Sequence, residues 1–286
     1  MKIKSTVGSR IFDTFNILFM LVLICVMVYP MVYVLSASIS DNAQVASGKV
    51  LLLPKDVTLV AYEQLVKNPD LWVSYWNTIR YTAVHVVLTL IATAAMAYPL
   101  AKKWLPGRRL ILVLCAFTLL FSGGMIPTFL VVQKLGILNT IWAIVLPTMI
   151  STWYLFIMRT FFEALPEELE DAATIDGCSS FQVLLRIVIP LSMPVMATIG
   201  LFTAVNQWNA FFDALIYMND RSMYPLQIML RNILVAGSTI QAEGDLSLMQ
   251  TMKYAIIIIA TLPILCVYPF IQKYFVQGTM IGGIKG

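Results

Sequence analysis

Residues 162–194 read FEALPEELEDAATIDGCSSFQVLLRIVIPLSMP and form a long polar interruption in the apolar second half of the chain. Pro166 suits the first position of a helix, because its missing N–H costs nothing there. The first turn then carries three carboxylates, which complement the positive end of the helix dipole: Glu167, Glu168 and Glu170. Gly177 stands where a left-handed residue ends a helix, and Ser179 with Gln182 has the spacing of a capping box. The stretch therefore predicts a short polar helix, a glycine turn and a second helix that returns into apolar sequence.

The composition is typical of a membrane protein. Of the 286 residues, 59% are hydrophobic and 12% are charged, whereas a soluble domain carries about 25% charged residues. Six intervals without a charged residue are each long enough to cross a bilayer as a helix of about 20 residues. We therefore expect an all-α, polytopic membrane protein with six transmembrane helices, at about residues 14–36, 77–100, 110–132, 138–158, 187–209 and 254–272.

The distribution of basic residues predicts the orientation. They cluster before the first span and in the short connection after the second: Lys2, Lys4, Arg10, Lys102, Lys103, Arg108 and Arg109. Because positive charge favours the cytoplasmic side, and an even number of spans puts both termini on one side, we expect residues 1–13 and 276–286 in the cytoplasm. The polar loop 160–186 then also faces the cytoplasm, while the longer connections, about 41–75 and 213–253, face outward.

The outward segment after the first span alternates turn residues with short amphipathic pieces, so we expect folded surface there rather than a linker. The net charge of +4 is explained by the cytoplasmic flanks. It indicates contact with anionic membrane lipid rather than nucleic acid, since no basic patch interleaves with aromatic residues.

Residues 171–177, DAATIDG, are followed after nine residues by IVIP at 187–190. This run resembles the EAA…G…I-x-L-P signature of ABC-importer permeases, in which the loop is a coupling helix that inserts into a cleft of a cytoplasmic ATPase. Asp171 stands in place of the usual Glu and shortens the reach by one methylene, and Ile189 replaces a Leu. The resemblance implies that this loop carries the ATPase-coupling residues: Glu168, Asp171, Ala172, Ala173, Asp176 and Gly177.

Residues 122–140, SGGMIPTFLVVQKLGILNT, and the glycine-rich tail resemble the carbohydrate subgroup of these permeases, the MalG-like and LplC-like kind. The resemblance implies a type I importer fold in a bacterial cytoplasmic membrane. It also implies three partners: a dimer of ABC ATPase subunits that binds ATP and Mg, a second homologous permease, and an extracellular sugar-binding lipoprotein or periplasmic protein. In such permeases the tail lies against the ATPase, which implicates Gly278, Met280, Gly282 and Gly283.

Two places in the spans are candidates for lining a sugar path. Asn206, Gln207 and Asn209 lie within one helical turn and cannot all face lipid without a cost of some kcal/mol. Amides hydrogen-bond sugar hydroxyls, and the indole of Trp208 beside them could stack on the apolar face of a sugar. The alternative is interhelical hydrogen bonding with an interfacial tryptophan, and the sequence does not decide between the two.

Gly123, Gly124 and Pro127 loosen the third span at mid-membrane depth. Such a break is tolerated only against protein or a water-lined cavity, which makes this segment the second candidate. Close helix packing through small residues is the alternative reading.

Several classes of function lack their motifs in this sequence. No G-x-x-x-x-G-K-[ST], H-E-x-x-H or G-x-S-x-G occurs, and His85 is the single histidine, so we expect no catalytic residue, no metal site and no cofactor bound by this chain. Three of the four cysteines lie in spans and one in the polar loop, which indicates neither a disulfide nor zinc: Cys25, Cys115, Cys266 and Cys178.

The competing function is an ion-coupled secondary transporter, which normally carries charged residues at mid-membrane depth. Apart from His85, which we read as a packed neutral residue, the spans offer none there. An importer for a solute other than sugar also stays open. The sequence thus favours a permease that is driven by a partner ATPase.

Overall fold

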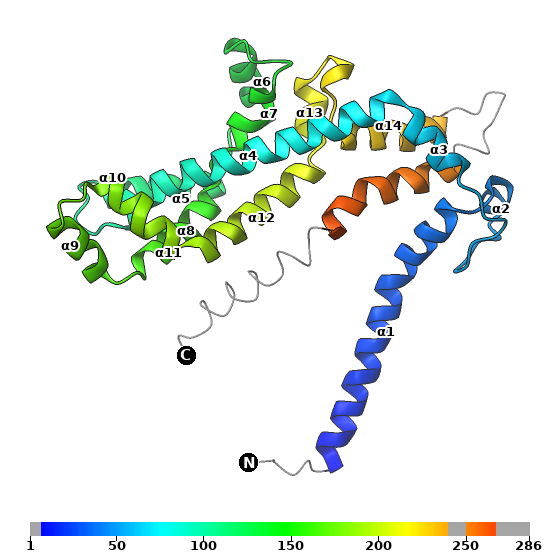
Figure 1. Ribbon diagram of the computed structural model, residues 1–286, viewed down its shortest axis with the longest axis horizontal. Helices are drawn as coiled ribbons and strands as arrows, with labels where there is room; N and C mark the ends of the chain where they lie inside the picture. The colour runs from blue at the N-terminus through cyan, green and yellow to red at the C-terminus, as the bar shows by residue number, and fades with distance from the viewer. Residues whose placement is uncertain (1–6, 240–249, 267–286) are drawn as a thin grey trace. The chain divides into compact units, whose positions relative to one another are not determined.

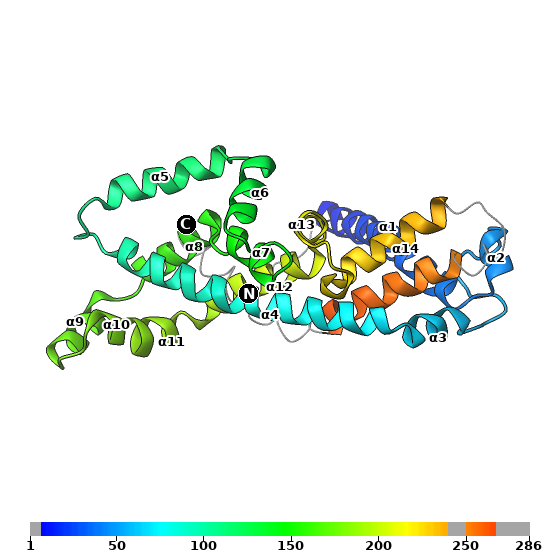
Figure 2. The same ribbon diagram turned by 90° about the horizontal axis from the view of Figure 1, so that it is seen from above.

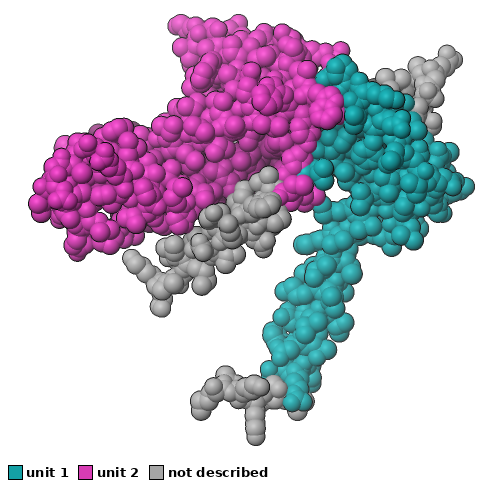
Figure 3. Space-filling model, in the orientation of Figure 1, with its two compact units in different colours: residues 1–69, 230–262 teal, residues 70–229, 263–286 magenta. Residues whose placement is uncertain are grey.

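The structure, a computed structural model, describes residues 7–239 and 250–266. Every regular element among these residues is a helix, which confirms the all-α prediction. The chain divides into two compact units, coloured separately in Figure 3: residues 1–69 with 230–262, and residues 70–229 with 263–286.

The first unit contains α1, Val7–Ser38, which is apolar over most of its length. The segment after it continues as α2, Asn42–Ala46, and α3, Val60–Lys67. Asn42 Oδ1 accepts hydrogen bonds from Thr251 N at 3.2 Å and from Thr251 Oγ1 at 2.6 Å. A small core lies beside this contact and is made of Ala37, Val45 and Val50. The segment is therefore folded, as its turn residues predict.

The second unit is organised along α4, Pro69–Ala101, with α8, Thr152–Glu163, and α12, Met193–Asn209, beside it (Figure 1). The three helices share one core, because small residues on α4 let larger side chains of the other two approach closely. The core includes Ala94, Ala97 and Ala101 of α4 with Leu155, Met158 and Ile199. At one end of this unit lie α9, Glu167–Ile175, and α10, Ser180–Val183.

Three of the predicted spans are bent pairs of helices rather than single helices. α5, Arg108–Leu120, meets α6, Met125–Lys134, at 114°, and Figure 2 shows this sharp angle. Gly124 lies at the break with φ of 83°, a left-handed conformation that strains other residues. The span is therefore interrupted at Gly123 and Gly124, where the sequence predicts a loosened helix.

The other two predicted spans are also bent. The pair Ile141–Thr148 and Thr152–Glu163 is bent by 55°, and the pair Ser180–Leu191 and Met193–Asn209 by 80°. The second bend follows a π-helical stretch, Leu184–Val188, that leads into Pro190, which has no N–H to continue the hydrogen-bond ladder.

The remaining elements are α7, Ile141–Val145; a 3₁₀ turn, Leu146–Thr148; α11, Ile189–Leu191; α13, Phe212–Tyr217; a 3₁₀ turn, Arg221–Met223; and α14, Leu226–Thr239.

Two helices, Gly8–Ser38 and Pro69–Ala101, are long and apolar enough to cross a bilayer unaided. The three bent pairs raise the number of candidate spans to five when each pair is taken as one crossing. A shorter apolar helix, Gln250–Cys266, overlaps the sixth predicted span, which extends beyond the described residues. The count of six spans stays a prediction.

Candidate functional site

The polar stretch forms the helix–turn–helix that its local signals predict. Pro166 precedes α9 as its N-cap residue, one position earlier than predicted, because its ψ of 126° is extended rather than helical. The three glutamates occupy the first turn of α9, as expected from the helix dipole. The result is a short helix with a strongly acidic start.

Between α9 and α10 the chain turns sharply at Gly177, whose φ is 84°. Gly177 N donates to Thr174 O at 3.0 Å, and Cys178 N donates to Ala173 O at 2.9 Å, the paired bonds of a Schellman motif. Ser179 then opens α10 with a complete capping box to Gln182. The predicted glycine turn and capping box are both confirmed, so this turn is held by its own backbone.

Ala173 is the one residue of α9 that is buried, and it packs into the core shared by α4, α8 and α12. Its small side chain lets α9 approach that core closely. The other proposed coupling residues are exposed: Glu168, Asp171, Ala172, Asp176 and Gly177. Ala173 therefore attaches α9 to the rest of its unit, and its neighbours present the outer surface.

An ion pair joins α9 to the end of α4. Lys102 pairs with Glu170, and Tyr98 Oη donates to the same carboxylate at 3.1 Å. The Lys102 and Glu170 side chains are 19% and 16% exposed, so the contact is largely removed from water. Lys102 Nζ also lies 4.8 Å from the centroid of the Tyr98 ring, within cation–π range. A displacement of α9 would therefore pull directly on α4.

A second network joins α8 to α4 and α5. Arg108 and Arg159 both pair with Glu163. Their Nε atoms both donate to Leu100 O, at 2.8 Å and 3.1 Å. The last carbonyls of a helix lack intrahelical partners, so the two guanidinium groups satisfy the end of α4 and tie it to the neighbouring helices.

Sequence reasoning missed the apolar residues on this surface. Ile175, the last residue of α9, is 86% exposed, and Leu169 and Phe181 are also exposed. Exposed apolar side chains of this size are candidate contacts for a partner protein. The sequence does contain a sign of this surface, because Ile175 is an apolar residue between polar neighbours inside the motif.

The second candidate site, at the end of α12, separates into buried and exposed residues. Gln207 is buried, and its Oε1 lies 2.7 Å from His85 Nδ1, while His85 Nε2 lies 3.3 Å from Thr148 O. Asp213, at the start of α13, is near this cluster, and burial raises the pKa of its carboxyl. Gln207 thus makes the interhelical hydrogen bond that was the alternative to sugar contact.

Trp208 is 8% exposed, and its ring lies 6.0 Å from that of Tyr75 in an edge-to-face arrangement. It lines a cavity of about 440 Å³ whose other walls are mostly aliphatic, including Ile79, Val86 and Leu201. Such a lining offers few partners for sugar hydroxyls.

Asn206 and Asn209 are the exposed members of the group. Asn206 Nδ2 donates to Tyr154 Oη at 3.1 Å, and Asn209 Nδ2 donates to Val205 O at 2.8 Å. Because they are three positions apart on one helix, they share a face, and no described hydrogen bond uses their amide oxygens. Gly123 and Gly124 lie in the break between α5 and α6. Four further predicted site residues lie outside the described residues: Gly278, Met280, Gly282 and Gly283.

These features define a class of protein: a multi-pass helical permease that presents one rigid polar helix–turn–helix. The chain belongs to the family described as binding-protein-dependent transport system inner membrane component, whose model matches residues 2–281. It is therefore an inner-membrane permease subunit of an ABC transporter with the type I fold, and its family works in general with an ATPase and a binding protein.

The chain is similar to Protein LplC of Bacillus subtilis (strain 168), with 45% identity over 99% of this chain and 97% of that protein. It is 41% identical to the polygalacturonan/rhamnogalacturonan transport system permease protein YtcP of the same organism, over 97% and 99% of the two chains. A solved structure, of a bacterial ABC transporter involved in the import of the acidic polysaccharide alginate, matches with a TM-score of 0.88 and 34% identity. That match covers 94% of this chain and 98% of the solved one.

Proposed function

We propose that this permease imports a sugar or oligosaccharide that an extracellular binding protein delivers. The similar permease YtcP is named for polygalacturonan and rhamnogalacturonan, and the similar solved structure concerns alginate import. Fragments of polysaccharides are therefore the favoured substrates, and acidic ones are the first to test. Asn206, Asn209 and Tyr154 are the groups we assign to contact with sugar hydroxyls.

The energy for import comes from a dimer of ABC ATPase subunits. These subunits, and not this chain, bind ATP and Mg. The observation that carries this assignment is the α9 surface: an acidic helix, fixed by the Glu170–Lys102 pair and by buried Ala173, that exposes Ile175. A rigid convex element with an apolar tip fits a cleft in a partner protein. When the ATPase subunits close on ATP, α9 moves with them and transmits the movement to α4.

In this proposal α9 and both termini lie in the cytoplasm, because the basic connection between α4 and α5 lies on the same side. The transport path forms between this chain and a second homologous permease. Movement of the two permeases turns a shared cavity outward to accept sugar and inward to release it. The loop 213–253 faces the binding protein.

The test is purification of the tagged permease in mild detergent, followed by identification of its partners. Co-purification of an ABC ATPase, a second permease and a binding protein is expected. Uptake should then require that ATPase and should survive a protonophore for as long as ATP is supplied. Uptake without any ATPase, abolished by the protonophore, would instead identify an ion-coupled carrier.

A further inference from the structure

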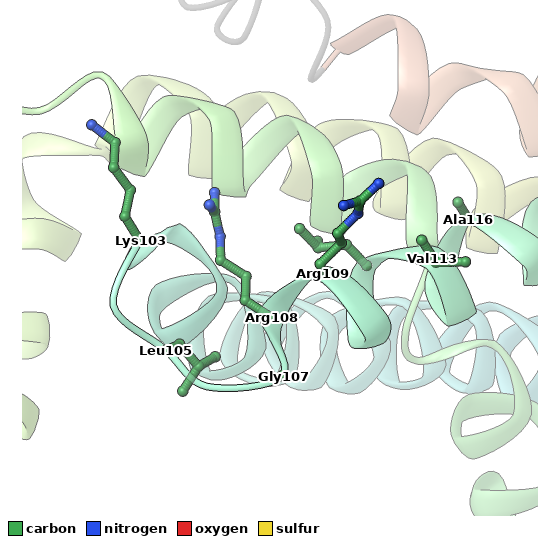
Figure 4. A pocket seen from close by; sticks show the side chains of 8 residues that line it. Lys103, Leu105, Gly107, Arg108, Arg109, Val113 and Ala116 are labelled. Atoms are coloured by element: carbon green, nitrogen blue, oxygen red, sulfur yellow. The ribbon is translucent and has the colours of Figure 1, made fainter.

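A cavity of about 600 Å³ lies beside the connection from α4 to α5 and continues along the first half of α5. Its lining includes Lys103, Arg108, Arg109, Leu112, Val113 and Ala116. Figure 4 shows the side chains of Lys103, Arg108 and Arg109 extending to the same side of the connection. The three cationic groups therefore line the cavity from the connection to the first turn of α5.

The charged side chains that line the cavity are all cationic: Lys103, Arg108 and Arg109. The carboxylates that pair with two of them lie outside the lining: Glu167 pairs with Lys103, and Glu163 pairs with Arg108. Within residues 7–239 and 250–266, Arg109 makes no side-chain hydrogen bond or ion pair, and the Lys103–Glu167 contact is long, at 3.9 Å, and solvent-exposed.

Arg108 is held in position for a ligand. Its Nε donates to Leu100 O, and one terminal nitrogen pairs with Glu163. A guanidinium group has five N–H donors, so the remaining ones stay free for a phosphate, whose geometry this planar group matches. The side chain thus loses little conformational freedom when it binds an anion.

The other end of the cavity is apolar. Leu112, Val113 and Ala116 continue along α5 from the cationic rim, and from Arg108 to Ala116 the helix rises about 12 Å. α5 has no buried residue in the described part of the chain. Trp104, in the same connection, is 76% exposed, as an interfacial tryptophan would be. A soluble phosphate would use the cationic end alone, whereas a phospholipid would use both.

We propose that this cavity binds an anionic phospholipid, with its headgroup among Lys103, Arg108 and Arg109 and an acyl chain along α5. Basic pockets at the ends of transmembrane helices suit such headgroups. The inference depends on the proposed function only because it requires the α4–α5 connection to lie at a membrane surface. Lipid bound there would sit beside the networks that join α4, α5 and α8.

The test uses the permease with its co-purifying subunits, and measures retained phosphatidylglycerol and phosphatidylethanolamine by native mass spectrometry. The variant is K103Q/R109Q, which leaves Arg108 and its structural contacts in place. Each cation near a membrane surface changes anionic lipid binding about fivefold, so the double variant should retain about 25-fold less phosphatidylglycerol. Retention of phosphatidylethanolamine should not change.

The control is K67Q, at an exposed lysine of α3 that pairs only with exposed Glu63 among the described residues, and it should behave as the natural sequence does. Equal phosphatidylglycerol retention by K103Q/R109Q and the control would overturn the proposal. Displacement of the lipid by equimolar glycerol phosphate would also overturn it and assign the cavity to a soluble anion. The measurement needs neither ATP nor sugar, so its failure is distinct from a failure of the proposed transport function.

Discussion

The fold does not require an apolar side chain at Ile175. Its side chain contributes to none of the described cores, and at 86% exposure it meets water in the isolated chain. Asn206 and Gln207 are adjacent in sequence but differ in burial. Asn206 is exposed beside Tyr154, whereas Gln207 is buried against His85. Substitutions at such exposed and buried residues can therefore distinguish a role in function from a role in stability.

The substitution Ile175→Ala should weaken binding of the ATPase without destabilising the permease. Truncating an apolar residue at the centre of an interface costs about 1–3 kcal/mol, so we expect affinity to fall by about 5- to 150-fold. Thermal stability of the permease should stay within about 0.5 kcal/mol. Titration of the detergent-solubilised permease with ATPase measures the affinity, and Leu53→Ala, at an exposed leucine outside α9, is the control. Equal affinities for the two variants would contradict the assignment.

The pair of substitutions Asn206→Ala and Gln207→Ala separates sugar contact from helix packing. Asn206→Ala should lower sugar uptake and leave the melting temperature unchanged, because its amide is exposed. Gln207→Ala leaves His85 without its closest partner and should destabilise the protein by about 1–3 kcal/mol. Uptake and thermal melting of both variants provide the measurement. Normal uptake by Asn206→Ala would remove that residue from the proposed path.

At the scale of elements, α9 is a short helix whose position depends on its attachments. Helices this short are marginal in isolation, so the turn at Gly177, the capping box and the contacts to α4 determine where it lies. The ion pair Lys102–Glu170 is the polar attachment and Ala173 the apolar one. In the proposed function, coupling to the ATPase therefore depends on these few local contacts.

Gly177→Val should uncouple uptake from ATP hydrolysis while the permease still inserts in the membrane. A Cβ at this position meets open space, so the effect comes from the left-handed backbone, which costs roughly 1–2 kcal/mol for a residue with a side chain. Gly177→Asn is the control, since Asn tolerates this conformation and should retain coupling. The ratio of sugar transported to ATP hydrolysed is the measurement. Normal uptake by Gly177→Val would contradict the role of the turn.

Glu170→Gln should loosen α9 from α4. The neutral side chain leaves Lys102 charged, mostly buried and without its carboxylate, and partial exposure reduces the expected loss of stability to about 1–3 kcal/mol. Thermal melting and ATPase-coupled uptake should both fall. Glu63→Gln breaks an exposed pair with Lys67 and should change stability by less than about 0.5 kcal/mol. An equal shift in melting temperature for the two variants would show that the contact to α4 contributes no more stability than an exposed ion pair.

For the whole molecule, the proposed orientation in the membrane rests on the distribution of charge. The connection from α4 to α5 is basic, and α9 is attached to it through Lys102–Glu170, so both must lie on one side of the membrane. Because positive charge favours the cytoplasmic side, we propose that this side faces the cytoplasm. The two elements support one another because the ion pair is a contact within one compact unit.

Cysteine labelling tests this orientation in cells. Single cysteines at positions 175 and 53 are introduced after replacement of the four natural ones, Cys25, Cys115, Cys178 and Cys266. A membrane-impermeant maleimide should label position 53 in intact cells, and position 175 only after permeabilisation. The reverse pattern would place α9 outside and remove the basis for ATPase coupling.

Short-range patterns were enough to predict the all-α fold, the break near Gly124, and the helix, turn and capping box of residues 167–183. Each of these is set by residues within one or two helical turns, because caps, glycine conformations and apolar runs act locally. Long-range contacts were not accessible in this way. Gln207 pairs with a histidine 122 positions away, and Glu170 with a lysine 68 positions away. Only packing of α4 against α8, α9 and α12 decides that Gln207 and Trp208 are buried while Asn206 and Ile175 are exposed, since burial depends on which helices meet.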